Sequence, residues 1–521
     1  MTSSKLSLLK VWILLPALVA GLWSLSSCQT KKKPSFLIVA VDRLSFNSFA
    51  CGEDKQNLNS GLSLLCREAI RFTHAYTTST QSAAALGSLL TGLYPVQHKL
   101  HRSFDRLQPG TKMVQEAADQ AGYQTYFFSG SPTILKKTGL SQGFDVFEDS
   151  GFFEKKTYFL DFKYQTEKFL TAVQDSSDPF FTVIYNSELE SLNEGESQIS
   201  SLEKLDEKFF KFFSDLKDRK MWEDNYVIVV GLQGKSDYSR YDETPFSNLN
   251  SENTRVNLFI KPPRSKGDEG IFWKMDSTVN LADLGTSIWA SLTDTKPNIK
   301  NSVESEYPII DFSSIWKTQN KNFAVPARKI LVEAANTWTK EISLRLAVLY
   351  KNLLHVEDDK PDVYNVLTDG LESINIASQQ KDFVADNNAD MAALRLQLDF
   401  TQWTNFKSKW QKWVFLNREY WSRPNARTSL LESELERIKK EKTTQPLSVF
   451  LARSLLQNKR VAEINQIKKI DSKQKNLTER TKAISFENVK QQSLNLALEN
   501  IWGLWETDKT WLQSNVILEN Q

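Results

Sequence analysis

Residues Val227 to Asp237 read VIVVGLQGKSD and define the most informative strand of the chain. The run from Asn225 to Val230 is short, apolar and rich in β-branched residues, which predicts a buried strand ending at Gly231. In open α/β folds, ligands bind beyond the carboxyl ends of such strands. Leu232 and Gln233 stand at that place, and neither carries a charge. The stretch therefore predicts the wall of a ligand site without the charges that such a site uses.

Around this strand, apolar strand-like runs alternate with helix-like runs along most of the first 300 residues. The predicted strands are Ser35–Asp42, Gly122–Phe128, Asp178–Asn186, Asn225–Val230 and Arg255–Lys261, and the predicted helices are Leu62–Ile70, Ala83–Leu90, Gly110–Ala121, Leu202–Leu216 and Ser277–Leu292. This alternation predicts an α/β fold with a mostly parallel central sheet and helices on both faces. The sequence contains no GxGxxG, P-loop or CxxC motif.

Length and composition narrow the functional classes. At 521 residues, with 40% hydrophobic and 25% charged residues, the chain is long enough for two or more globular domains. Lys and Arg total 65 against 63 Asp and Glu, so no overall positive field indicates a nucleic-acid partner. Only 4 histidines are present, which argues against a histidine-rich metal site.

The N-terminus has the pattern of a targeting segment. Lys5 and Lys10 precede an apolar run, Val11 to Leu22, that is too short to span a bilayer comfortably. Leu25-Ser26-Ser27-Cys28 then resembles a bacterial lipobox, which implies a diacylated (palmitate-type) Cys28 anchored to a membrane face. The alternative is a plain signal peptide with an incidental cysteine. No Asp follows Cys28, which favours the outer membrane in a two-membrane cell.

The other two cysteines, Cys51 and Cys66, leave two readings open. Export would permit a disulfide between them, and two separate buried thiols fit the sequence equally well.

Beyond about Asp382 the chain becomes charged, helical and rich in tryptophan. Trp403, Phe406, Trp410 and Trp413 recur at three- and four-residue steps, which places them on one helix face. We interpret this stripe as the core of a helical bundle; the alternative is a groove for a partner peptide or glycan.

Several blocks in this order carry a resemblance to the sulfatase family of the alkaline-phosphatase-like superfamily. They are AIRFTHAYTTSTQSAAALGSLLTGLYPVQH (Ala69–His98), AGYQTYFFSGSPTILKKTGLSQGFDVFED (Ala121–Asp149) and DVYNVLTDGLESINIA (Asp362–Ala377). The likeness spans about Ser35 to Ser378 and implies a small antiparallel subdomain after the main sheet. It also implies cleavage of sulfate or phosphate esters, by a nucleophile and a calcium ion held by carboxylate and amide oxygens.

Residue by residue, the resemblance implies a degenerate site. Asp42 matches the first metal-binding Asp of the family, while Arg43 replaces a frequent second Asp. Ser82 falls at the nucleophile position, but Ala84 and Leu86 replace the Pro and Arg that accompany its conversion to formylglycine. Arg43 could pair with Asp42 or bind an anion. Ser82 could instead cap the helix that follows it.

Further positions of the family pattern hold unlike residues. Gly130 and Pro132 stand in place of a Lys and a His, and Glu190 in place of a His. The paired metal ligands of the family, an Asp followed by His or Asn, fall on Leu232 and Gln233. One Asp and a neutral amide supply too little negative charge for a hard dication, so we expect no cofactor.

We therefore predict an envelope lipoprotein whose sulfatase-like domain is catalytically degenerate, a pseudoenzyme that binds a sulfated or anionic glycan or an envelope protein. One alternative is an active sulfuric or phosphoric ester hydrolase that uses calcium, with Asp237, Glu188 or Glu190 as replacement ligands. Another is a structural scaffold whose cleft is filled by Leu232. The expected segments are a signal peptide (1–27), a lipidated tether (28–34), the α/β/α domain (35–320), a small subdomain (321–382) and a helical extension (383–521).

Overall fold

The structure is a computed structural model of the whole chain. It describes residues 33–49, 51, 60–102, 105–151, 159–190, 198–234, 249–264, 273–295, 306–318, 322–335, 344–357 and 361–396. Cys28, Asp237 and the aromatic stripe from Trp403 to Trp413 lie outside the described residues. Among the described helices, none is long and apolar enough to cross a membrane.

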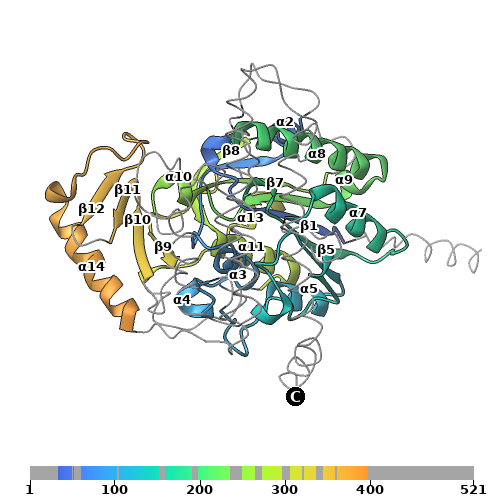
Figure 1. Cartoon of the computed structure of the whole chain (residues 1–521), viewed down its shortest axis with the longest axis horizontal. Helices are drawn as coiled ribbons and strands as arrows, with labels where there is room; N and C mark the ends of the chain where they lie inside the picture. Colours follow the sequence, from blue (N-terminus) through green and yellow to red (C-terminus); the bar gives the residue numbers. More distant parts are fainter. Residues whose placement is uncertain are drawn as a thin grey trace, which may run out of the picture. The chain divides into compact units, whose positions relative to one another are not determined.

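Within the described residues, eight strands form one large mixed sheet in the order β4-β3-β5-β1-β6-β7-β2-β8 (Figure 1). The strands are β1 (Phe36–Val41), β2 (Ile70–Tyr76), β3 (Gln124–Ser129), β4 (Val146–Glu148), β5 (Phe180–Asn186), β6 (Tyr226–Gly231), β7 (Arg255–Lys261) and β8 (Trp273–Asn280). Only β7 runs antiparallel to its neighbours, β6 and β2. The predicted α/β class with a mostly parallel sheet is confirmed.

Helices cover both faces of this sheet. The helices and 3₁₀ turns are η1 (Phe46–Ser48), α2 (Gly61–Glu68), α3 (Ser82–Thr91), α4 (Pro95–His98), α5 (Val114–Gln120), η2 (Lys136–Thr138), α7 (Phe162–Ala172), η3 (Glu188–Glu190), α8 (Gln198–Asp218), α9 (Met221–Asp224), α10 (Ser251–Thr254), α11 (Leu281–Thr293), α13 (Ser314–Lys317), η4 (Ala377–Gln379) and α14 (Lys381–Leu396). One apolar core joins the sheet to α3, α5 and α11, and a second joins it to α2, α7 and α8.

The centre of the sheet brings three strand ends together. Strand β1 lies between β5 and β6, with Ala40 opposite Tyr185 on one side and Val230 on the other. All three strands run in the same direction and are buried along their length, as expected for strands covered on both faces. The residues that follow them, including Asp42 and Leu232, therefore lie at one carboxyl edge of the sheet.

Several predicted helix boundaries are wrong in detail, and two of them fall on residues that belong to strands. The predicted helix Ser277–Leu292 begins only at Leu281, because the residues before it belong to β8 and Asn280 caps the helix by accepting a hydrogen bond from the Asp283 N–H at 2.9 Å. The helix predicted over Leu62–Ile70 ends at Glu68, and Ile70 already starts β2.

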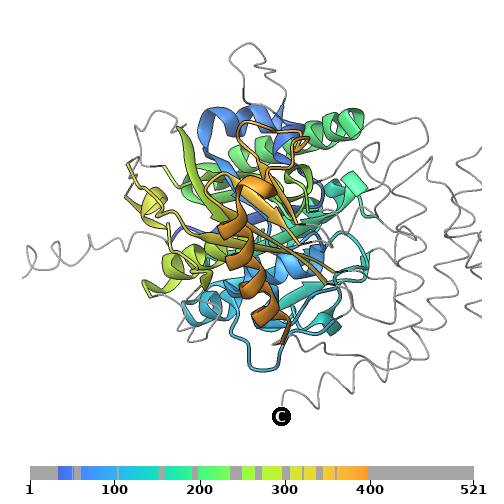
Figure 2. The same cartoon turned by 90° about the vertical axis from the view of Figure 1, so that its left-hand side faces the viewer.

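A second, antiparallel sheet contains β9 (Lys329–Ala335), β10 (Leu344–Tyr350), β11 (Leu353–Val356) and β12 (Asp362–Asn365) in sequential order, and Figure 2 shows it in front of the large sheet together with α14. It is joined to the large domain just before α3. Glu333 donates its N–H to the Thr78 carbonyl and accepts from the Thr80 N–H, both at 3.0 Å. The predicted small antiparallel unit is thus present.

The two open readings of the cysteines are resolved: Cys51 and Cys66 form a disulfide, which ties the chain after η1 to helix α2.

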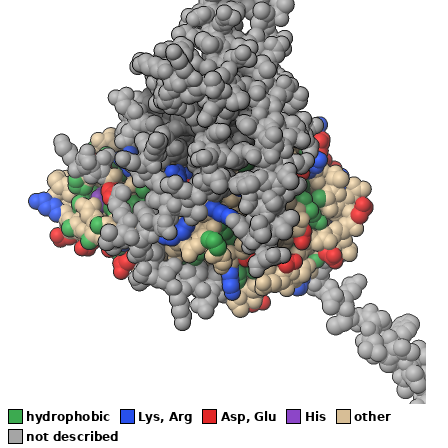
Figure 3. Space-filling view, turned by 60° about the horizontal axis from the view of Figure 1, so that its bottom comes forward, with side chains coloured by type: hydrophobic (Ala, Val, Ile, Leu, Met, Phe, Trp, Pro, Cys, Tyr) green, Lys and Arg blue, Asp and Glu red, His purple; other side chains and the backbone are tan. Residues whose placement is uncertain are grey.

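On the face in Figure 3, acidic and basic side chains of the described residues are interspersed.

Candidate functional site

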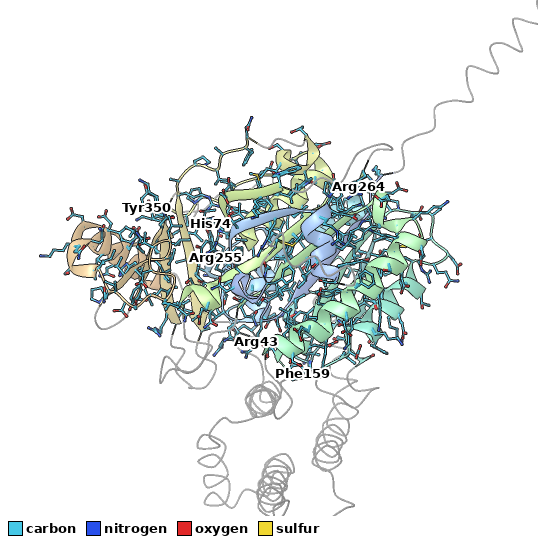
Figure 4. All side chains as sticks on the ribbon, turned by 90° about the horizontal axis from the view of Figure 1, so that it is seen from above. Arg43, His74, Phe159, Arg255, Arg264 and Tyr350 are labelled. Atoms are coloured by element: carbon cyan, nitrogen blue, oxygen red, sulfur yellow. A yellow bond between two sulfur atoms is a disulfide. The ribbon has the colours of Figure 1, made fainter. Side chains whose placement is uncertain are left out.

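Polar side chains from five separate segments meet at the carboxyl edge of the large sheet. We call them the carboxyl-edge cluster; its members are Asp42, Arg43, Ser82, Tyr185, Ser187, Glu190 and Gln233, and each of these residues is at least 95% buried. They follow or end β1, β5 and β6, or belong to η3 and the start of α3. Figure 4 shows Arg43 at this edge and Arg264 at the opposite edge of the sheet.

Asp42 is held by hydroxyl groups. The Tyr185 hydroxyl donates to Asp42 Oδ2 at 2.6 Å, and the Ser187 hydroxyl donates to the same oxygen at 2.8 Å. Burial, reinforced by the negative charges of Asp42 and Glu190, raises the pKa of Tyr185 well above its ordinary value, so its hydroxyl stays protonated and acts as a donor. One oxygen of the buried Asp42 carboxylate, Oδ2, therefore accepts two hydrogen bonds from hydroxyl groups.

Arg43, Glu190, Gln233 and Ser82 form a continuous chain of contacts. Arg43 Nε lies 3.5 Å from Glu190 Oε1, an ion pair of two buried side chains. The Gln233 amide donates to Glu190 Oε1 at 3.3 Å and to Ser82 Oγ at 3.1 Å. The structure thus gives Arg43 the carboxylate of Glu190 as its ion-pair partner, and it links the nucleophile position to that pair through a neutral amide.

The predicted capping role of Ser82 is wrong. Helix α3 is capped at Gln81, without a side-chain cap hydrogen bond, and Ser82 is its first helical residue. Because Ser82 lies one position inside the helix, its side chain does not cap the helix. Its hydroxyl oxygen instead accepts a hydrogen bond from the Gln233 amide.

At positions 130, 132 and 232, where the resemblance implies a Lys, a His and an Asp, the structure has buried residues without charge. Leu232 is fully buried and belongs to the apolar core on the α3 side of the sheet. Gly130 packs so tightly that a side chain there would collide with the Tyr185 carbonyl oxygen. Pro132 is also buried. A lysine at position 130 or an aspartate at position 232 would require the surrounding backbone or core to shift.

Glu188, a candidate replacement ligand, and the buried histidines His98 and His101 have structural roles. Glu188 accepts from the Phe162 N–H and pairs with Lys208 at 2.7 Å, so it joins helices α7 and α8. His98 contacts the Ser88 hydroxyl at 3.1 Å, and His101 contacts both carboxylate oxygens of Glu333, at 2.9 and 3.0 Å. These contacts join α3, α4 and the small sheet.

The cluster does not fit a catalytic calcium ion. Calcium takes six to eight oxygen ligands, several of them anionic. Here the Arg43 guanidinium offsets one of the two carboxylates, leaving a formal charge of −1 from Asp42, Glu190 and Arg43 together. Within the described ranges, no group of three or more His, Cys, Asp or Glu side chains is placed to hold a metal ion.

Tyr185 and Ser187 were missed from the sequence, although a signal existed. Tyr185 lies at the end of the predicted strand Asp178–Asn186, and Ser187 follows it directly. If this strand lay beside the predicted strand Ser35–Asp42, both side chains would be close to Asp42. Only the strand order, with β5 beside β1, turns this into a contact.

The chain is similar to known proteins in part of its sequence and in its fold. Residues 34–188 match the family model described as Sulfatase. No curated protein matches the sequence. A Bacteroides thetaiotaomicron structure connected with the metabolism of multiple glycosaminoglycans is 13% identical, with a TM-score of 0.55 over 74% of this chain and 99% of its own. A putative sulfatase of the same organism is 14% identical, with a TM-score of 0.56 over 72% and 96%.

A phosphonate monoester hydrolase of Agrobacterium radiobacter is 12% identical, with a TM-score of 0.54 over 71% of this chain and 96% of its own. At these identities the likeness is one of fold, and it extends beyond the segment matched by the family model. The chain therefore contains a sulfatase-like domain, and its large sheet and small antiparallel sheet share the fold of these structures.

Proposed function

We propose that this protein is a non-catalytic, sulfatase-like lipoprotein of the cell envelope that acts by binding. One observation carries the proposal: the chain's own Arg43–Glu190 ion pair and the Gln233 amide fill the edge where a hydrolase needs a dication and an activated nucleophile. Ester cleavage requires fixed positive charge against the leaving oxygens. The positive charge of Arg43 is instead directed at Glu190.

Two further features support the cellular setting. The Cys51–Cys66 disulfide suits an oxidising compartment outside the cytoplasm. The lipobox-like sequence before Cys28 would hold the domain at a membrane face, with outer membrane favoured in a two-membrane cell. As ligand we propose a sulfated or otherwise anionic glycan, the class suggested by a neighbour described as a 2-O glycosaminoglycan sulfatase.

The test measures metal content and turnover on the purified full chain. We expect no stoichiometric divalent ion after gel filtration, and no release of sulfate or phosphate from aryl esters that depends on Ser82. Ser82→Ala is compared with Ser88→Ala, a matched serine on the same helix. Stoichiometric calcium, together with turnover lost in Ser82→Ala and Asp42→Ala but kept in Ser88→Ala, would overturn the proposal.

A working hydrolase with replaced ligands is the second candidate, because Glu190, which replaces a family His, does lie in the cluster. The same measurement separates the two. Binding itself is followed by the melting temperature: a rise with sulfated glycans, absent with a neutral glycan of equal length, is expected for the non-catalytic protein.

A further inference from the structure

The buried arginines of the described residues differ in how their charge is balanced. Three of the four pair with a carboxylate: Arg43 with Glu190, Arg102 with Asp105 and Arg328 with Asp283. Arg71, the fourth, is 4% exposed, and its hydrogen bonds within the described residues go to neutral oxygens. Its Nη2 donates to the Phe49 carbonyl at 2.7 Å and to Asn257 Oδ1 at 3.0 Å, while its Nε is buried without a hydrogen-bond partner. A buried charge without a counter-charge is strongly unfavourable.

A second guanidinium lies beside that of Arg71. Arg255 is partly exposed, and its Nε donates to the Thr73 carbonyl at 2.8 Å, with Nη2 donating to the same oxygen. Both guanidinium carbons lie over one ring, that of Phe46, at 3.9 Å from its centroid for Arg255 and 4.6 Å for Arg71. Burial and the charge of Arg255 lower the pKa of Arg71 to about 10, and no described carboxylate offsets this effect. The ring and the carbonyls stabilise the two cations without cancelling their charge.

The sheet register places another basic side chain on the same face. Arg71 of β2 is paired with Phe259 of β7 on one side and with Lys274 of β8 on the other. Arg255 lies four positions before Phe259 in β7, so both point to the same face, the one that packs against α2. Three basic side chains from three neighbouring strands therefore share one face of the sheet.

The polar residues next to Arg255 include a histidine and one carboxylate. His74 Nδ1 lies 2.9 Å from Thr73 Oγ1, and the Thr73 hydroxyl donates to Asp276 Oδ1 at 2.6 Å. Burial and the charge of Arg255 lower the pKa of His74, so its ring is neutral near pH 7. The formal charge that remains is +2, from Arg71, Arg255, Lys274 and Asp276 together.

We propose that Arg255 and Arg71, on the ring of Phe46, form an oxyanion-binding site for a sulfate or carboxylate group of an anionic glycan. The inference rests on the proposed function, and it places the charge of the ligand at β7 and β2 rather than at the carboxyl-edge cluster. Figure 4 shows Arg255 and His74 together, away from Arg43. Arg43 already has the carboxylate of Glu190, whereas the charges of Arg71 and Arg255 are left for a ligand.

The two arginines have different roles in this site. A guanidinium has five N–H donors in a planar fork that matches an oxyanion. Arg255 is the partly exposed one, and its donors that do not bind the Thr73 carbonyl contact the ligand. Arg71 lies deeper and adds positive charge behind it.

The test is calorimetric titration of the full chain at fixed ionic strength with a heparin oligosaccharide, a neutral glycan of equal length and inorganic sulfate. Arg255→Gln should weaken binding of the heparin oligosaccharide about ten-fold or more. Arg345→Gln, at a partly exposed arginine of β10, is the matched control and should bind like the natural protein. Inorganic sulfate should bind more weakly than the oligosaccharide and compete with it; sulfate binding as tight as that of the oligosaccharide would contradict a glycan site.

A second measurement uses the natural chain, because Arg255→Gln also removes hydrogen bonds to β2. Phenylglyoxal modifies guanidinium groups, and peptide mass mapping follows the reaction at each arginine. The heparin oligosaccharide should slow modification of Arg255 and leave that of Arg345 unchanged, and the neutral glycan should protect neither.

Equal binding by the natural protein and Arg255→Gln, an equal loss in Arg345→Gln, or no protection of Arg255 contradicts the inference and leaves the proposed function intact. If the natural protein binds none of the probes, the inference and the proposed ligand both fail. Calcium-dependent turnover that requires Ser82, with Arg255 still protected by the oligosaccharide, contradicts the proposed function alone.

Discussion

The two edges of the large sheet both contain charged side chains, but they anchor them in different ways. At the amino edge, Lys261 Nζ donates to the backbone carbonyls of Trp222, Glu223 and Asn225, the last two at 3.2 and 3.3 Å. Glu68 there accepts from Trp222 Nε1 at 2.7 Å. These bonds fix strand β7 and helix α2 to the short helix α9, so their role is to hold the fold.

At the carboxyl edge, side chains bind side chains. Glu190 is held by Arg43 and Gln233, and Asp42 by the hydroxyls of Tyr185 and Ser187. Such contacts can be exchanged by substitution without moving a strand or helix. This difference explains how a chain can keep a sulfatase-like sheet while the charges at its ligand edge are rearranged, since a matched exchange of side chains there leaves the backbone contacts of the strands in place.

The largest effect is expected from breaking the ion pair at the carboxyl edge. Glu190→Ala leaves Arg43 buried without its carboxylate, which should lower the free energy of unfolding by about 3–5 kcal/mol. The double variant Arg43→Met/Glu190→Leu replaces both charges with apolar groups and should recover most of this loss. Urea denaturation in EDTA measures both. An equal loss of unfolding free energy in the single and the double variant would show that the buried, unpaired charge of Arg43 is not the cause of the loss.

A smaller effect is expected at the amino edge. Burial alone would raise the pKa of Glu68, but hydrogen bonds from Trp222 and Lys217 and the charges of Lys217 and Arg264 hold it below the ordinary value of 4.5. Glu68→Gln should lower the free energy of unfolding by about 1.5–3 kcal/mol at pH 7.

The lowered pKa of Glu68 also fixes the pH dependence of this loss. The stabilisation is complete above the unfolded pKa and disappears as pH falls through the folded one, so the difference from the natural protein should shrink below about pH 4.5. Urea denaturation between pH 7 and 3 measures it, and a constant difference across that range would contradict the assignment.

The smallest effect is a pH response of the helix that begins at Ser82. Burial lowers the pKa of His98, beside Ser88 of α3, to about 3. In the unfolded chain the pKa of His98 is about 6.5. Below this pH the unfolded chain binds a proton that the folded chain does not bind, so the free energy of unfolding decreases as the pH is lowered. The loss should be about 1 kcal/mol between pH 6.5 and 5.5.

His98→Gln should reduce the slope of the pH profile in this window, and the part that remains belongs to His74 and His355, whose pKa values burial also lowers. Glu68→Gln should leave the slope unchanged there. Thermal or urea unfolding at these pH values separates the two edges. A slope in His98→Gln equal to that of the natural protein would contradict the role given to His98.

The sequence by itself determined the layers of the fold and the missing charges. Strands such as β1 and β6 were predictable because buried parallel strands are continuous apolar runs, and the antiparallel β7 was predictable from its own apolar run. Strand β2 was missed, since its residues follow a helix-like run directly and IRFTHAY alternates poorly. Leu232 and Gly130 showed from the sequence alone that charge is absent where the family pattern expects it.

Only the tertiary structure decided what replaces those charges. Tyr185 donates to Asp42 across 143 positions of the chain, and Arg43 reaches Glu190 rather than solvent. Local periodicity reports which face of a strand is buried, but it carries no information on strand order. The neighbours of β1 in the sheet are β5 and β6, and this order brings the five segments of the carboxyl-edge cluster together. Side-chain partners at a sheet edge are set by that order, because each strand end contributes only one or two residues to the contact.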